Sequence, residues 1–198
     1  PFCAALAHST SQIDDMGSSM MQWEVLRGSI FKYVRIKVGT CMIAAAVAAS
    51  SAFVVHAIIW NIIALPCDPT TYPNHTIYFD PSCIFYNWYT ICYGLPVYFE
   101  ITIGIGFTAS VWAVVALAVA VWIPDKLLVV AIPAAIFYIW NADISFYVFG
   151  VPLPSPASLF NDGLSVQRMA ITLIMYAVAF AVSAGGFYMG CRRRCQHV

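Results

Sequence analysis

Four polar side chains lie inside or at the edges of long uncharged stretches: His56, Glu100, Asp143 and Arg168. An ionisable group in hydrocarbon is costly and usually faces protein or water. At about 1.5 Å per helical residue, His56 and Asp143 lie about 26 Å and 24 Å along their stretches, and Glu100 and Arg168 lie at the ends of theirs. The four predict one polar cluster lining an outward-facing vestibule, in which Arg168 compensates a carboxylate. The alternative is that Glu100 and Arg168 sit in interfacial water and His56 hydrogen-bonds within the bundle.

No other residues have the spacing of a catalytic site. The patterns G-x-x-x-x-G-K-[ST], H-E-x-x-H, C-x-x-C and G-x-S-x-G do not occur in the chain. The sequence therefore predicts a protein that is not an enzyme and that needs no cofactor and no metal. Its net charge of zero gives it no general attraction for nucleic acid.

Two pairs of cysteines invite chemistry of their own. Cys67 and Cys83 share one loop, so a disulfide between them is geometrically conceivable if that loop faces an oxidising exterior, with free thiols as the alternative. Cys191 and Cys195 flank three arginines, a setting that permits acylation but is also common without it.

The elements that must position these side chains are membrane spans. Hydrophobic residues make up 62% of the 198 residues and charged residues 9%, whereas a soluble domain is roughly 25% charged. The uncharged stretches 38–67, 101–124 and 169–191 each exceed the roughly 20 residues that cross a bilayer, and a fourth, 127–142, continues past Asp143. We predict an all-α, polytopic transmembrane helix bundle with four complete spans and the end of a fifth.

The chain is predicted to form a single transmembrane domain over residues 1–198. Its segments are the end of a span (1–8), a cytoplasmic amphipathic segment (9–37), a span (38–65), an outer loop with an aromatic interfacial part (66–96), two spans (97–122 and 127–149), an outer loop (150–168), a last span (169–190) and a cytoplasmic tail (191–198).

The cations fix the predicted orientation. With these spans, eight of the nine Lys and Arg residues fall on one side and only Arg168 on the other. Loops rich in Lys and Arg stay in the cytosol, so we predict a multi-pass protein of the plasma membrane with a cytoplasmic carboxyl terminus. The eight are Arg27, Lys32, Arg35, Lys37, Lys126, Arg192, Arg193 and Arg194.

Residues 20–37 combine these cations with loosely periodic apolar side chains. This pattern predicts a helix lying in the membrane interface, bent or broken at Gly28 and Ser29. A plain juxtamembrane anchor is the alternative. Small residues at 44–51, at 104–110 and at Gly185 and Gly186 predict close helix packing, which the sequence does not distinguish from a pore or a dimer face.

The order of these elements resembles the membrane subunits of bacterial ABC-2 type exporters, particularly the permeases of Gram-positive bacteria. The resemblance covers essentially the whole chain. It comprises a span end and polar turn, the basic stretch MMQWEVLRGSIFKYVRIKVG, a Pro-rich outer loop, Glu100 in VYFEITIGIG, the turn IPDKLLVV, the loop PLPSPASLFNDG and the tail CRRR.

The resemblance implies six spans in the full-length protein, so that this chain lacks the first and most of the second. It also implies a second permease subunit, identical or not, and separate ATP-binding subunits that hydrolyse ATP. Glu24, Arg27, Lys32 and Arg35 would then lie where the ATPase docks. The alternative from another class is a non-transporting membrane scaffold, sensor or immunity protein.

Overall fold

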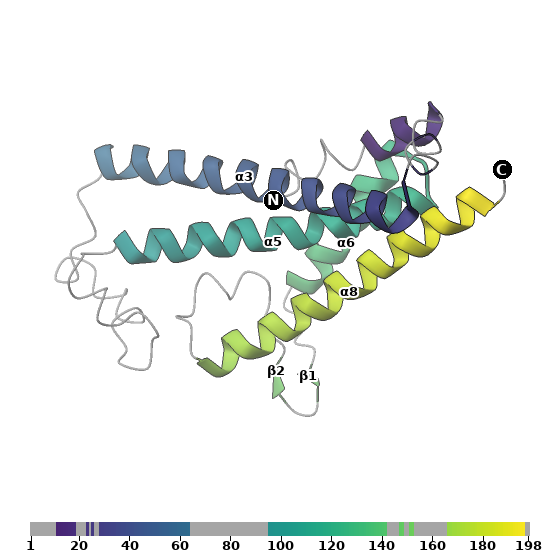
Figure 1. Cartoon of the computed structure of the whole chain (residues 1–198). Helices are drawn as coiled ribbons and strands as arrows, with labels where there is room; N and C mark the ends of the chain where they lie inside the picture. Colours follow the sequence, from purple (N-terminus) through teal and green to yellow (C-terminus); the bar gives the residue numbers. More distant parts are fainter. Residues whose placement is uncertain are drawn as a thin grey trace.

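The described chain is a bundle of helices (Figure 1). A computed structural model describes residues 11–18, 23, 25, 28–63, 95–141, 147–148, 151–152 and 166–196. A short helix covers residues 11–17. It is followed by α3 (Ile30–Ile63), α5 (Leu95–Trp122), α6 (Lys126–Asn141) and α8 (Val166–Gln196), with a two-residue antiparallel pair, β1 (Tyr147–Val148) and β2 (Val151–Pro152), between the last two helices.

The helix α5 is the centre of the bundle and contacts α3, α6 and α8. It runs antiparallel to α3, since Ser110 of α5 bonds to Met42 while Thr102 bonds to Ser50. It runs parallel to α8, since Thr108 meets Tyr176 and Trp122 meets Gly186. The alternating directions of α3, α5, α6 and α8 are those of a chain that crosses a layer repeatedly.

The prediction of an all-α membrane bundle is confirmed in its coarse form. Three helices are long and apolar enough to cross a bilayer, over Ile30–His56, Ile101–Trp122 and Leu173–Gln196. The helix α6 has 16 residues, which at 1.5 Å per residue span about 24 Å and not the roughly 30 Å of a hydrocarbon core. The fourth complete span, 127–149, and the span end at 1–8 therefore stay predictions, because residues 1–10 and 142–146 lie outside the described residues.

The start of α3 differs from the predicted boundary. The chain bends at Gly28, and a continuous helix begins at Ile30, eight residues before the predicted span at 38–65. Residues 30–37 are therefore the first two turns of the long helix and not part of a separate interfacial one. Charge marks the place where a helix leaves the apolar layer, but its hydrogen-bonded backbone continues beyond that point.

Small residues bring α3 and α5 together. Ala45 and Ala49 of α3 and Ala109 and Ala113 of α5 are all buried. A Cβ on Gly106 would overlap the Ser50 hydroxyl and lie 3.5 Å from the Ala46 carbonyl oxygen. The predicted close packing is thus present at this interface, where van der Waals contact takes the place of the hydrophobic effect as the force between helices in lipid.

Ser110 tests whether space or hydrogen bonding holds α3 to α5. Its hydroxyl is 2.9 Å from the Gly106 carbonyl and 3.1 Å from the Met42 carbonyl of α3. We expect Ser110→Ala to lower the free energy of unfolding by only about 0.6 kcal/mol, the usual worth of an interhelical hydrogen bond in a membrane protein. Ser110→Leu should cost about 1–3 kcal/mol through overpacking. Unfolding in mixed micelles measures both, and equal losses would contradict the role of space.

Candidate functional site

The cations of the described chain gather at one end of the bundle, here called the basic end. It comprises the start of α3 with Lys32, Arg35 and Lys37, the turn before α6 with Lys126, and the end of α8 with Arg192, Arg193 and Arg194. The start of α3 and the end of α8 lie together at the right of Figure 1. This grouping follows from the alternating directions of the helices.

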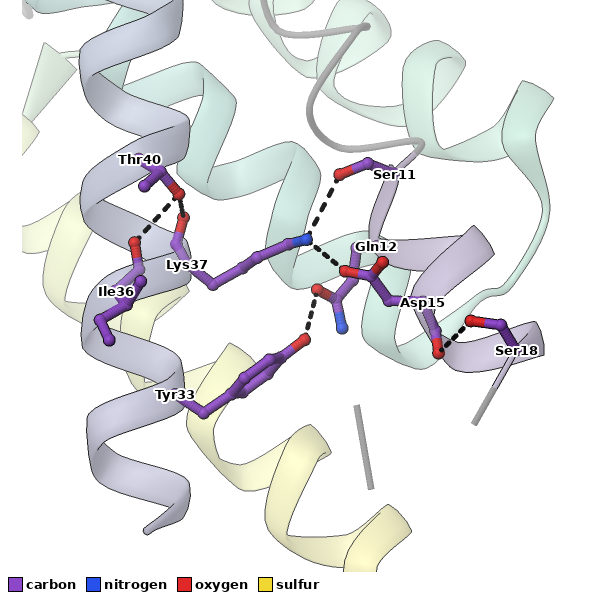
Figure 2. Close-up of polar contacts among 8 residues, drawn as sticks. All are labelled: Ser11, Gln12, Asp15, Ser18, Tyr33, Ile36, Lys37 and Thr40. Carbon is purple, nitrogen blue, oxygen red and sulfur yellow. Dashed lines mark hydrogen bonds and ion pairs between the residues drawn. The ribbon is translucent and has the colours of Figure 1, made fainter. Parts of the chain in front are cut away.

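The helix at residues 11–17 docks on the basic end through a buried polar contact (Figure 2). Gln12 is fully buried, and its side-chain oxygen accepts a hydrogen bond of 3.0 Å from the hydroxyl of Tyr33, which is also buried. On either side, Ile13 packs against Ala116, Ala120 and Val129 of α5 and α6, and Met16 packs against the main core. An amide buried this deeply is stable only while its partner is in place.

Two neighbouring aspartates of the same helix form ion pairs in different surroundings. Asp15 pairs with Lys37 of α3, whose ammonium group also lies 3.4 Å from the Ser11 hydroxyl. The side chains of Lys37 and Asp15 are only 20% and 25% exposed. Asp14 pairs with Lys126 at 2.8 Å, but these side chains are 60% and 63% exposed. Solvent screens the outer pair, so the inner pair carries most of the electrostatic attachment.

The end of α8 is fixed to the end of α5 by four contacts. A Cβ on Gly190 would overlap Val121 Cγ1 and lie 3.2 Å from Val121 Cβ. The Trp122 indole N–H donates to the Gly186 carbonyl at 3.2 Å, and Arg194 Nε–H donates to the Val121 carbonyl at 2.9 Å. The Arg193 guanidinium lies 5.9 Å from the Trp122 ring centroid. Two arginines are thus held in place at the carbonyl end of α5, where positive charge complements the helix dipole.

The predicted docking residues are described in part. Lys32 and Arg35 lie on the first two turns of α3, and both are exposed. Glu24 and Arg27 lie outside the described residues. The two described cations are three positions apart on one helix, so they lie on the same face.

The predicted polar cluster is described mainly through its backbone. His56 is exposed on α3, with its ring 6.3 Å from that of Phe53. Glu100 and Arg168 belong to α5 and α8, each eight residues before the contacting pair Thr108 and Tyr176 (108 − 100 = 8; 176 − 168 = 8). Their backbones therefore begin the two parallel helices at similar heights. The Glu100 and Arg168 side chains, Asp143, Cys67 and Cys83 lie outside what the structure describes.

Sequence reasoning missed the docked helix and misassigned the close glycines. Residues 9–18 read as a polar turn, although Ile13 and Met16 three positions apart form a short apolar face that could have indicated a packed helix. Gly185 and Gly186 have open space around the position of a Cβ, and Gly190 makes the close approach. The prediction for Gly185 and Gly186 is wrong within this chain, because spacing alone does not show which glycine faces the neighbour.

The described residues offer little to reagents at the cysteines and no metal site. Cys41 and Cys191 are buried and Cys195 is half-buried, so Cys191 is closed to acylation in this fold. No group of three or more His, Cys, Asp or Glu within the described ranges could hold a metal ion.

Set against protein-family models, curated proteins and solved structures, the chain matches none.

Proposed function

We propose that the chain is a membrane-spanning permease subunit of an ABC-type exporter, driven by a separate ATPase subunit. The observation that carries the proposal is the basic end: three membrane-length helices bring their cations to one side, with Lys32 and Arg35 exposed there. By the positive-inside rule this side is the cytosol, which gives a multi-pass protein of the plasma membrane with a cytoplasmic carboxyl terminus. A fourth span continuing from α6 to residue 149, and six spans in the full-length subunit, belong to the same proposal.

The helix α3 is suited to transmit movement from an ATPase into the bundle. It is one continuous helix of 34 residues, about 51 Å long at 1.5 Å per residue. Its first turns present the exposed cations, and its middle packs tightly on α5. A partner that binds these turns differently in two states of its cycle shifts the equilibrium between two arrangements of the bundle.

The translocation path in this proposal lies between two permease subunits. Within the described chain, the α3–α5 interface is filled by buried small residues, and its hydroxyl groups bond to carbonyls. Both α3 and α8 expose large apolar side chains, which suits lipid or a second subunit. The most exposed are Phe31, Ile43, Val47, Ile174, Val182 and Met189.

The dense packing around α5 also favours a second candidate, a non-transporting membrane scaffold, sensor or immunity protein. Such a protein needs a rigid frame and no path. An ATPase with a phosphate-binding G-x-x-x-x-G-K-[ST] loop encoded beside this chain would favour export.

Charge reversal tests the docking surface. We expect Lys32→Glu with Arg35→Glu to lower recovery of a co-purifying ATPase subunit from native membranes by at least about tenfold, since rim charges placed against like charges cost several kcal/mol. Arg192→Glu with Arg193→Glu, the same charge change at the same end of the bundle, is the matched control and should leave recovery unchanged. Unaltered recovery with the α3 pair, or no ATPase with the unmodified chain, would refute the proposal.

A further inference from the structure

Trp122 and the three arginines Arg192, Arg193 and Arg194 form a surface, here called the tip, in which two guanidinium groups are already oriented. Arg193 lies over the Trp122 ring, and Arg194 is fixed through its Nε–H to the Val121 carbonyl. The Trp122 ring is itself fixed by its bond to Gly186. Oriented side chains lose little entropy when they bind a ligand.

These guanidinium groups retain donors for a ligand. A guanidinium has five N–H donors, and the bond from Arg194 to Val121 uses the Nε–H alone. All three arginines are exposed. The ion pairs among the described residues are Lys37–Asp15 and Lys126–Asp14, so no described carboxylate neutralises the tip. Paired N–H groups of this kind fit the oxygens of a phosphate.

The surroundings of the tip are apolar and lie at the end of a membrane-length helix. Trp122 is 48% exposed and Met189 is 59% exposed. Met189 precedes Arg192 by three positions and so shares its face of α8. The helix that ends at the tip, Leu173–Gln196, is long enough to cross the bilayer. Apolar side chains directly beside oriented cations are the arrangement that meets acyl chain and head group together.

We propose that the tip binds the phosphate group of an anionic phospholipid. The apolar neighbours distinguish this ligand from a free phosphate, and the positive charge distinguishes it from a zwitterionic lipid. Lipid binding at the tip requires neither an ATPase nor a transported substrate, so it stands or falls separately from the exporter proposal.

The test measures lipid selectivity of the whole chain in vesicles of phosphatidylcholine and phosphatidylglycerol. Electron paramagnetic resonance of spin-labelled lipids gives the association ratio of the anionic over the zwitterionic lipid, which we expect to be about tenfold. Arg192→Gln with Arg193→Gln should bring this ratio close to one. Lys32→Gln with Arg35→Gln removes the same charge from the same end of the bundle and should leave most of the selectivity. Equal losses in the two double variants would show a diffuse charge effect and overturn the proposal.

Two further arms keep the test decisive. Trp122→Phe leaves every charge in place but removes the N–H bond and the larger ring, so the ratio should fall about threefold because the arginines are less well oriented. An unchanged ratio would contradict an oriented site, even if the double arginine variant fails to fold. Inorganic phosphate and chloride at equal ionic strength should reduce the ratio equally, and a larger fall with phosphate would mean that the tip takes a free anion instead.

Discussion

Asp15→Asn will detach the helix at residues 11–17 from the bundle, while Asp14→Asn will leave it in place. The first change strands the Lys37 ammonium group, which is only 20% exposed, and a hydrogen bond to a charged group is worth about 1.5–3 kcal/mol. Amide exchange at residues 11–17 should therefore speed up by about tenfold to a hundredfold. The second change removes a pair whose side chains are 60% and 63% exposed, worth at most about 1 kcal/mol, so exchange should rise by less than about fivefold.

The two aspartates are a matched pair, since they are adjacent, chemically identical and each bonded to a lysine. Hydrogen exchange followed by mass spectrometry on the protein in detergent measures both variants in one experiment. Equal acceleration in the two, or none with Asp15→Asn, would contradict the attachment of this helix through the Lys37 pair. Exchange in the middle of α3 serves as the internal reference and should stay constant.

Gly190→Ala will separate the ends of α5 and α8, while Gly185→Ala will not. The added methyl group of Gly190→Ala overlaps Val121, whose branched side chain has little freedom to rotate away. Overpacking of this kind costs about 1–3 kcal/mol. Gly185 has open space at the same position, so its replacement by alanine should be neutral or stabilise α8 by about 0.5–1 kcal/mol through helix propensity.

A compensating change makes the Gly190 experiment specific. Val121→Ala vacates the space that the new methyl group needs, so the Gly190→Ala, Val121→Ala double variant should recover much of the lost stability, a coupling typical of residues in contact. Unfolding in mixed micelles gives the free energies of all four proteins. Additive losses in the double variant would show that the two residues do not share this contact.

The sequence was most informative about where the chain crosses the membrane. The absence of charge between residues 101 and 124 placed one span close to α5, Leu95–Trp122, because lipid excludes charge along the whole of a span. It was less informative about helix ends. The cations at 32–37 marked the membrane surface, and α3 continues through that surface to Ile30.

Contacts between helices were harder to foresee than the helices themselves. Gly185, Gly186 and Gly190 are equivalent in the sequence, and only the crossing of α5 and α8 selects Gly190 for the close contact. Gln12 and Tyr33 are 21 residues apart and meet because the chain turns back before α3. Such pairings depend on the directions of whole elements, which local patterns do not contain.

The side of the membrane on which the basic end lies is the point that most directly decides between these interpretations. Gln196→Cys, exposed near the end of α8, would be made in a chain whose seven native cysteines are replaced, and labelled with a maleimide that does not cross membranes. We predict labelling only after the cells are permeabilised, while Asn74→Cys in the predicted outer loop is labelled in intact cells. Labelling of Gln196→Cys in intact cells would contradict a cytoplasmic basic end, and with it the docking of an ATPase there.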